Sequence, residues 1–358
     1  MTEKRRHFAS DNNAGIYPEV LEVLAEASHG HVTGYGADSY TAAAQQAICE
    51  LFETECAVFF VSNGTAANCL GLAAGLRPFS AIIAHQQSHL ETDECNAVGF
   101  FNQGVKVIGV GGRDAKIDPD SIEQSICGQR EVHASKPRAI SITNATELGT
   151  VYRVAEIRVL TAIARDHNLI AQLDGARFAN AIAHLGCAPA ELTWKAGIDV
   201  LSFGGTKNGL AFGEAIVFFR TDLAADFAYR MKQSGQLASK MRFLAAPWLA
   251  LLKEGLWLRR ASHANAMAER LCQKIALLPG IRILYPREAN SVFAKLSPEV
   301  VQAMYRRGWR FYTDVGPDDG ARLMCSWDTT EEDVDSFARD LGDCLALIAT
   351  HADAHPIA

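Results

Sequence analysis

The sequence lacks the features that mark membrane, secreted and nucleic-acid-binding proteins. Its longest nearly apolar run, residues 243–252, is about half of the roughly 20 residues that a membrane-spanning helix needs, so a buried helix is expected there. No apolar segment follows the basic N-terminal residues, so we expect no secretory signal. Lys+Arg 34 against Asp+Glu 41 gives a formal net charge of −7, and no basic run stands out, which argues against nucleic acid or an anionic membrane as a partner.

Several metal and nucleotide motifs are absent as well. The nine cysteines are scattered without any CxxC pair, which favours reduced thiols in the cytoplasm over disulfides or a zinc knuckle. His85 and His89 stand four residues apart, but HExxH is missing and no third ligand is near, so no metal site is predicted. GxGxxG and GxxxxGK[ST] are also missing, which counts against a dinucleotide or a nucleoside triphosphate.

The chain does contain a regular alternation of short apolar runs and longer helical patterns. Its length of 358 residues suggests two domains. Continuous apolar runs are typical of strands covered on both faces. The expected strands are Val58–Val61, Ala81–Ala84, Val105–Val110, Ala139–Thr143, Leu169–Leu173, Val200–Phe203 and Ala215–Phe219. Helical patterns between them, at Thr65–Leu76, Asp118–Ile126 and Arg153–Asp166, predict an α/β fold with a mostly parallel seven-stranded sheet.

The pattern changes after about residue 221. A long helical stretch is expected from Asp222 to about Leu278, interrupted at Pro247. Further strands are expected at Arg282–Leu284, Ser291–Ala294 and Arg322–Ser326. We therefore predict a large domain over residues 1–250 and a smaller C-terminal α+β domain over residues 251–358.

The first motif that carries chemistry is the segment Ser62-Asn63-Gly64-Thr65-Ala66-Ala67-Asn68, directly after an expected strand. A glycine-containing turn that opens a helix presents free backbone N–H groups, and the helix dipole favours an anion such as phosphate there. Plain strand-to-helix turns have similar sequences, so this segment alone does not decide the function.

Two more motifs follow expected strands. Asp174-Gly175-Ala176-Arg177 places an acid and a base at a strand end, although Asp174 could instead cap a helix. Gly204-Gly205-Thr206-Lys207-Asn208-Gly209 places a lysine at another strand end, although a surface loop is the commonest place for a single lysine. Together, a phosphate turn, an acid and a reachable lysine are what pyridoxal phosphate (PLP) requires. The lysine forms a Schiff base and the acid keeps the pyridine nitrogen protonated.

The order of these motifs resembles fold-type I PLP enzymes and, more narrowly, the L-threonine aldolase (β-eliminating lyase) family. The resemblance runs from Ser10 to Asp328. The segments that carry it are Ser10-Asp11-Asn12, Tyr35-Gly36-Ala37-Asp38, residues 62–68, residues 174–181 and the segment from Arg322 to Asp328. GGTKNG replaces a Ser-Lys-Gly version, and Asn63 stands where the family usually has Ser-Gly-Thr. These departures resemble the branch of low-specificity threonine aldolases and phenylserine aldolases.

The resemblance implies roles for individual residues. Lys207 would be the Schiff-base lysine and Asp174 the partner of the pyridine nitrogen. His89 would stack on the cofactor ring, and His133 would approach the substrate hydroxyl. The residues that would meet the phosphate are Asn63, Gly64 and Thr65. The residues that would hold the carboxylate of the amino acid are Ser10, Arg177, which also belongs to the cofactor site, and Arg322.

The resemblance also implies an oligomer and a reaction. Tyr35, Lys232 and Lys240 match positions that enter the substrate site of a neighbouring subunit, so a homodimer or homotetramer is expected. The implied reaction is cleavage of L-β-hydroxy-α-amino acids (threonine, allo-threonine or phenylserine) to glycine and an aldehyde, with His133, His89 or a water as base. The sequence leaves open β-elimination, transamination, serine hydroxymethyl transfer and a non-catalytic binding protein.

Overall fold

The structure is a computed structural model that describes residues 7–128 and 131–354. All seven strands predicted for the first domain form and join in one sheet of order β1-β7-β6-β5-β4-β2-β3. Their bounds are β1 Ala57–Val61, β2 Ser80–His85, β3 Lys106–Val110, β4 Lys136–Thr143, β5 Ile170–Gly175, β6 Val200–Phe203 and β7 Glu214–Phe218. The neighbours from β3 to β6 pair in parallel, and only β7 runs antiparallel to both of its neighbours. The predicted mostly parallel sheet is therefore confirmed.

The strand register sets the chemical edge of this sheet. Thr143 at the end of β4 pairs with Asp174 of β5, which in turn pairs with Ser202 of β6. The carboxyl ends of these parallel strands are therefore level. Because ligands of open α/β sheets bind outside such ends, the segments that follow the strands face one crevice.

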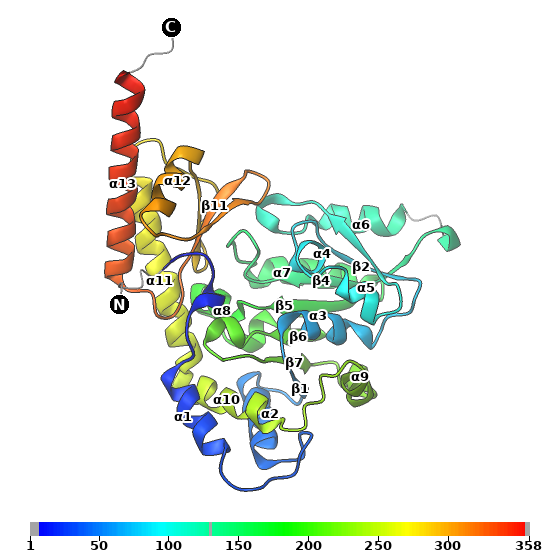
Figure 1. Cartoon of the computed structure of the whole chain (residues 1–358). Helices are drawn as coiled ribbons and strands as arrows, with labels where there is room; N and C mark the ends of the chain where they lie inside the picture. The colour runs from blue at the N-terminus through cyan, green and yellow to red at the C-terminus, as the bar shows by residue number, and fades with distance from the viewer. Residues whose placement is uncertain (1–6, 129–130, 355–358) are drawn as a thin grey trace.

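Helices alternate with these strands and pack on the sheet (Figure 1). The helices of this part are α1 Pro18–Ala27, α2 Ser39–Leu51, α3 Gly64–Ala73, α4 His89–Thr92, α5 Ala97–Phe101, α6 Pro119–Cys127, α7 Val154–Asp166, α8 Phe178–Leu185, α9 Phe227–Gln233 and α10 Arg242–Leu252. As expected, Asp118 caps α6, where its carboxylate accepts a hydrogen bond from the Asp120 N–H. Helix α3 lies against β5, β6 and β7, which brings its N-terminus to the chemical edge.

The long helix predicted from Asp222 is wrong, because the segment forms α9, α10 and α11 (Leu256–Ala276). Pro247 lies inside α10, and the breaks fall at residues 234–241 and at Lys253–Gly255. The sequence-based expectation treated proline as a helix breaker. Tertiary packing overrides that tendency here, because Trp248 and Leu251 of α10 are fully buried.

A second, antiparallel sheet of order β10-β11-β9-β8 follows, with bounds β8 Arg282–Ile283, β9 Ser291–Lys295, β10 Tyr312–Val315 and β11 Gly320–Met324. Strand β10 was not predicted, since its residues are exposed or half-buried and form no apolar run. Helices α11, α12 (Pro298–Arg306) and α13 (Glu331–Ala354) stand beside this sheet (Figure 1). The domain boundary near residue 250 stays a prediction.

The N-terminal arm is part of the second hydrophobic core. Phe8 is buried there against Trp309 and Phe337, with ring centroids 5.8 and 5.1 Å away. Its backbone N–H donates to Arg310 O, and its carbonyl accepts from the Met324 N–H. This anchoring leads residues 10–12 towards the edge of the large sheet.

Residues 7–128 and 131–354 contain neither a helix suited to crossing a membrane nor a cluster of side chains suited to a metal ion. None of their helices combines the length and the apolar character of a membrane-crossing segment. No group of three or more His, Cys, Asp or Glu side chains in these ranges is arranged to hold a metal ion.

Candidate active site

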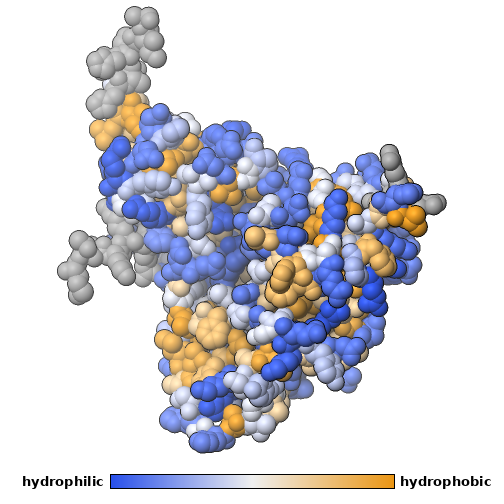
Figure 2. Space-filling view, turned by 45° about the vertical axis from the view of Figure 1, so that its right-hand side comes forward, coloured by the Kyte–Doolittle hydropathy of each residue, from blue (hydrophilic) through white to orange (hydrophobic). Residues whose placement is uncertain are grey.

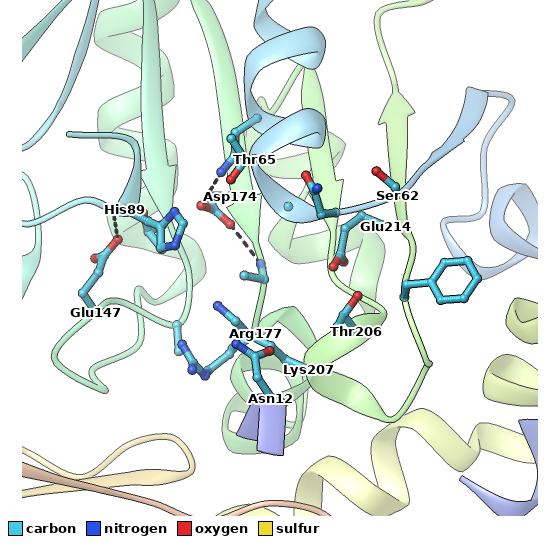
Figure 3. A pocket seen from close by; sticks show the side chains of 17 residues that line it. Asn12, Ser62, Thr65, His89, Glu147, Asp174, Arg177, Thr206, Lys207 and Glu214 are labelled. Atoms are coloured by element: carbon cyan, nitrogen blue, oxygen red, sulfur yellow. Dashed lines mark hydrogen bonds between the residues drawn. The ribbon is translucent and has the colours of Figure 1, made fainter. Parts of the chain in front are cut away.

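A cavity of about 400 Å³ opens where the carboxyl ends of β1, β4, β5 and β6 meet. Figure 3 shows side chains from these separate segments converging on it. Among the residues that line it are the predicted Asn63, Gly64, Thr65, His89, Asp174, Arg177 and Lys207. The structure therefore brings together the three motifs that the sequence placed after different strands.

Lys207 lies in a 3-10 turn, Thr206–Asn208, three residues after β6. The turn is fixed to the core by the buried Tyr17, whose hydroxyl donates to Asn208 Oδ1 at 2.8 Å. Gly204 is required here, since a Cβ would lie 2.5 Å from the carbonyl oxygen of Ala176. Burial, and then the positive charge of Arg177, lower the pKa of Lys207. The amine is thereby shifted towards its neutral, nucleophilic form.

Asp174 is buried at the end of β5, where both of its oxygens are hydrogen-bonded. Its Oδ2 accepts from Asn68 Nδ2 at 2.8 Å, and its Oδ1 accepts from the Ala176 N–H at 3.0 Å. The alternative of a helix cap does not hold, because α8 starts at Phe178 and its N-cap residue is Arg177. The structure thus leaves the Asp174 carboxylate as part of the cavity wall.

His89 starts α4 and reaches the same cavity. Its Nδ1 lies 2.8 Å from Glu94 Oε1, and the same oxygen accepts from Asn68 Nδ2 at 2.9 Å. The hydrogen bond to Glu94 raises the pKa of His89, although burial acts in the opposite direction. The imidazole is therefore fixed in orientation and favoured in its protonated form.

The opposite end of the cavity suits a phosphate. Asn63 caps α3 by accepting from the Ala66 N–H at 2.9 Å, and the first N–H groups of a helix have no partner within the helix. Thr206 Oγ1 is buried and, among the described residues, finds no hydrogen-bond partner. An anion at this end would accept hydrogen bonds from the first N–H groups of α3 and from the Thr206 hydroxyl. Glu214 lies nearby, and burial raises the pKa of its carboxyl to about 7, which limits the charge it would set against a phosphate.

A second cavity of about 530 Å³ adjoins the first. It shares Asn12, His89, Glu147, Arg177 and Lys207 with the first cavity. Its outer wall carries the predicted carboxylate-binding residues Ser10 and Arg322. Arg322 stacks on Tyr312, 5.0 Å from the ring centroid, and its buried Nε lacks a partner within the described ranges. This guanidinium is placed to receive an anion.

Arg177 is already engaged by the N-terminal arm. Its Nε and Nη2 donate to the two oxygens of Asp11 at 2.7 and 2.8 Å; the Asp11 side chain is buried, and that of Arg177 is 13% exposed. Asn290 also donates to Asp11. Burial alone would raise the pKa of Asp11, but the paired Arg177 outweighs it and holds the pKa below its usual value. Only Nη1 of Arg177 is left outside this pair. Arg177 thus differs from Arg322, because a carboxylate of the protein itself already occupies most of its guanidinium.

Four predicted site residues lie outside both cavities of this chain. His133 is exposed and precedes β4, whose carboxyl end carries the site, so the eight residues of the strand separate them by roughly 26 Å. This placement does not support an approach of His133 to the substrate within one chain. Tyr35, Lys232 and Lys240 are also exposed and line neither cavity.

Sequence reasoning missed six residues of the site. Asp11, Asn68 and Thr206 stood inside the quoted motifs but received no role, although an Asn one turn into a phosphate-binding helix was a usable signal. Glu94, Glu147 and Glu214 belong to no motif, and their positions depend on the tertiary fold.

A mostly parallel sheet with these groups at one edge defines the class of protein, an enzyme built on the fold of fold-type I PLP-dependent enzymes. The chain belongs to the beta-eliminating lyase family, which matches residues 7–298. It is therefore an enzyme of the lyase class, as the sequence predicted.

Individual relatives agree with this assignment. A low specificity L-threonine aldolase of Pseudomonas aeruginosa is 51% identical over 341 residues, which cover 95% of this chain and 98% of that protein. Another from a Pseudomonas species is 50% identical over the same length. A solved threonine aldolase structure from Leishmania major has a TM-score of 0.88 and 31% identity, covering 94% of this chain and 98% of that one.

The Asp11–Arg177 pair generates a stability prediction. Asp11→Asn leaves the buried Arg177 charge without its partner, so the free energy of unfolding should fall by about 3–5 kcal/mol at neutral pH. The ionised form of Asp11 stabilises the fold, so its contribution is present above the ordinary pKa of 3.8 and is lost below it. The difference between variant and wild type should therefore shrink as the pH falls below that value. Urea unfolding at several pH values measures it.

The matched control is Asp222→Asn, which breaks an exposed pair with Arg220. Exposed pairs contribute little, so this variant should be close to wild type. Equal effects of the two substitutions would show that the buried pair does not hold the arm.

Proposed function

We propose that the protein is a PLP-dependent aldolase that cleaves L-β-hydroxy-α-amino acids to glycine and an aldehyde. The observation that carries the proposal is the convergence of Lys207, Asp174 and the N-terminus of α3 on one cavity, with a carboxylate-binding cavity beside it. The names of the relatives support the reaction, since those at 50% identity and above are low specificity L-threonine aldolases.

The residues present fit PLP. The unpartnered Thr206 hydroxyl and the first N–H groups of α3 would hold the phosphate. Asp174, whose oxygens are already fixed by Asn68 and Ala176, would face the pyridine nitrogen. When bound, the cofactor supplies an electron sink for the pair left on Cα when a bond to that carbon breaks.

The remaining groups of the chain bind and orient the substrate. Lys207, with its lowered pKa, provides the amine that holds the cofactor, and Arg322 with Ser10 binds the carboxylate of the amino acid. Arg177 contributes from its Nη1 side, because Asp11 occupies the other side. A carboxylate held at two points fixes which bond of Cα lies perpendicular to the cofactor ring, and hence which bond breaks.

The proposed substrates are threonine, allo-threonine and phenylserine. The second cavity, about 530 Å³, has the volume for side chains of this range. All nine cysteines are free thiols, which supports the cytoplasmic location expected from the sequence.

We also propose that the site is completed by a second copy of the chain. Tyr35 lies on one surface with Lys232 and Lys240, although it is far from both in sequence. Lys232 Nζ is 5.2 Å from the centre of the Tyr35 ring, and the Tyr35 N–H donates to Ser239 O, next to Lys240. Figure 2 shows hydrophobic residues gathered on the lower part of the molecule, which carries α1, α2 and α10; exposed Leu21 belongs to α1. Such a surface favours burial against a partner.

The test of the proposed function is a product assay joined to cofactor mapping. Wild-type protein with PLP should release glycine and an aldehyde from threonine or phenylserine, and borohydride should fix the pyridoxyl group on Lys207. Lys207→Ala should fold normally and lose turnover below detection, because it removes a nucleophile and no core contact. The control Lys106→Ala, at an exposed position of β3, should behave as wild type. An adduct on another lysine would contradict the assignment.

Asp174→Asn separates the role on the cofactor from a purely structural one. The substitution keeps the shape and removes the charge, so we expect near-normal melting, retained PLP with an altered absorption spectrum, and kcat lowered at least roughly a hundredfold, or about 2.7 kcal/mol. Asp118→Ala, which removes the cap of α6, should instead lower stability by about 0.5–2 kcal/mol and leave kcat unchanged. Near-normal kcat with lowered melting for Asp174→Asn would mean that the site is wrongly centred.

Subunit sharing predicts complementation between inactive variants. If Tyr35 acts in the partner's site, a mixture of Tyr35→Ala and Lys207→Ala should form mixed dimers with one intact site. Random mixing should restore about a quarter of wild-type activity, since half of the dimers are mixed and each has one intact site of two. Light scattering measures the dimer, and failure to restore activity would argue against sharing.

A further inference from the structure

Glu147, a carboxylate that no sequence motif marks, lies where the two cavities meet. It follows β4 and lines both the cavity of Lys207 and Asp174 and the cavity of Ser10 and Arg322. Figure 3 shows it beside His89 at one side of the pocket. A group on an amino-acid substrate beyond Cα, between the cofactor end and the carboxylate-binding wall, would therefore meet these two side chains.

The contacts of Glu147 hold it in place without saturating it. Its Oε1 accepts a hydrogen bond from the backbone N–H of His89 at 2.8 Å. Its Oε2 is buried and has no hydrogen-bond partner in the described part of the chain. An ionised carboxylate with a buried oxygen left unpaired is unfavourable, so the group favours a proton or a hydrogen-bond donor.

The electrostatic surroundings act in the same direction. Burial raises the pKa of Glu147 to about 7, and the negative charge of Asp174 adds to the effect, whereas the backbone N–H groups of His89 and Glu147 and the nearby Thr143 hydroxyl oppose it. The titratable and charged groups that face Glu147 or share its cavities are His89, Asp93, Tyr152, Asp174, Arg177, Lys207, Glu214, Tyr312, Asp314 and Arg322. A carboxyl that titrates near neutral pH can both take and return a proton.

His89 is less suited to accept a proton. Its Nδ1 is bound to the buried Glu94, and this hydrogen bond raises the pKa of the imidazole. A ring favoured as imidazolium donates hydrogen bonds and accepts none. Of the two side chains at the junction, Glu147 is thus the proton acceptor and His89 the donor.

We propose that Glu147 is the general base that removes the proton from the β-hydroxyl of the substrate. The proposal rests on the aldolase function proposed above. As the O–H bond breaks, its proton moves to the Glu147 carboxylate and the oxygen pair forms the C=O bond of the aldehyde. The Cα–Cβ bond breaks and leaves its pair on Cα, which takes up a proton to become glycine. Glu147 then releases its proton to solvent.

Glu147→Gln tests this role, because glutamine keeps the acceptor for the His89 N–H and cannot take up a proton. In the PLP-loaded enzyme, cleavage of phenylserine should fall about 100- to 10,000-fold in kcat. Exchange of the α-protons of glycine with deuterated solvent involves no β-hydroxyl and should stay within about threefold of wild type. Glu123→Gln, on α6 outside both cavities, is the matched control and should change neither rate.

Two pH measurements add readouts that a structural role would not move. For wild type, kcat/KM for cleavage should rise with pH up to about 7 and then level, since only ionised Glu147 accepts the proton; Glu147→Gln should lose this inflection. Infrared difference spectra of wild type minus Glu147→Gln should show a protonated carboxyl that ionises near neutral pH. Glu147→Asp should recover part of the cleavage rate.

The outcomes separate the two proposals. Normal cleavage by wild type together with cleavage within tenfold of wild type by Glu147→Gln would overturn the role of Glu147 alone. Equal loss of cleavage and of glycine exchange would also overturn it, since the substitution would then disturb the whole site. Absence of aldehyde from wild type with any β-hydroxy amino acid would overturn the proposed function and this role with it.

Discussion

The side-chain amide of Asn68 is the contact on which the geometry of the site depends. Both of its N–H bonds are used, one to Asp174 Oδ2 and one to Glu94 Oε1, so two carboxylates are positioned by one residue of α3. Its oxygen accepts from Gln172 Nε2, which fixes the orientation of the amide. Because neutral amides satisfy these carboxylates, their charges stay available to His89 and to a cofactor. An arginine in the same place would neutralise them.

A second constraint links the two sheets. Phe8 packs in the core of the smaller sheet, and three residues later Asp11 pairs with Arg177 at the edge of the larger one. Arg322 comes from β11 of the smaller sheet, whereas Lys207 follows β6 of the larger one. The distance between the carboxylate-binding group and the reactive amine is therefore set by packing between the sheets, and the arm bridges them.

Much of the fold was predictable because buried parallel strands are short apolar runs flanked by turn-forming residues such as glycine, as in Val200–Phe203. Strand β10 was not, since it lies at the edge of its sheet, where burial imposes no apolar pattern. In the site, Lys207 and Asp174 were predictable because they lie at or shortly after the carboxyl ends of buried strands. Glu147 was not predictable, because its loop has no periodic pattern and its carboxylate is positioned by the backbone N–H of His89, 58 residues away along the chain. The Asp11 partner of Arg177 was likewise invisible to local patterns.

The junction of the cavities contains two groups whose pKa values are raised for different physical reasons. Glu94 raises the pKa of His89 through a hydrogen bond, and burial raises the pKa of Glu147 to about 7. The charge of protonated His89 is paired with Glu94, and Glu147 favours its neutral form. Neither side chain therefore buries an unpaired charge, which lowers the cost of burying the two together. By microscopic reversibility, a base that takes a proton during cleavage must return it during addition of glycine to an aldehyde. A carboxyl with a pKa near 7 does both at similar cost, whereas an ordinary exposed carboxylate would be too weak a base for the first step.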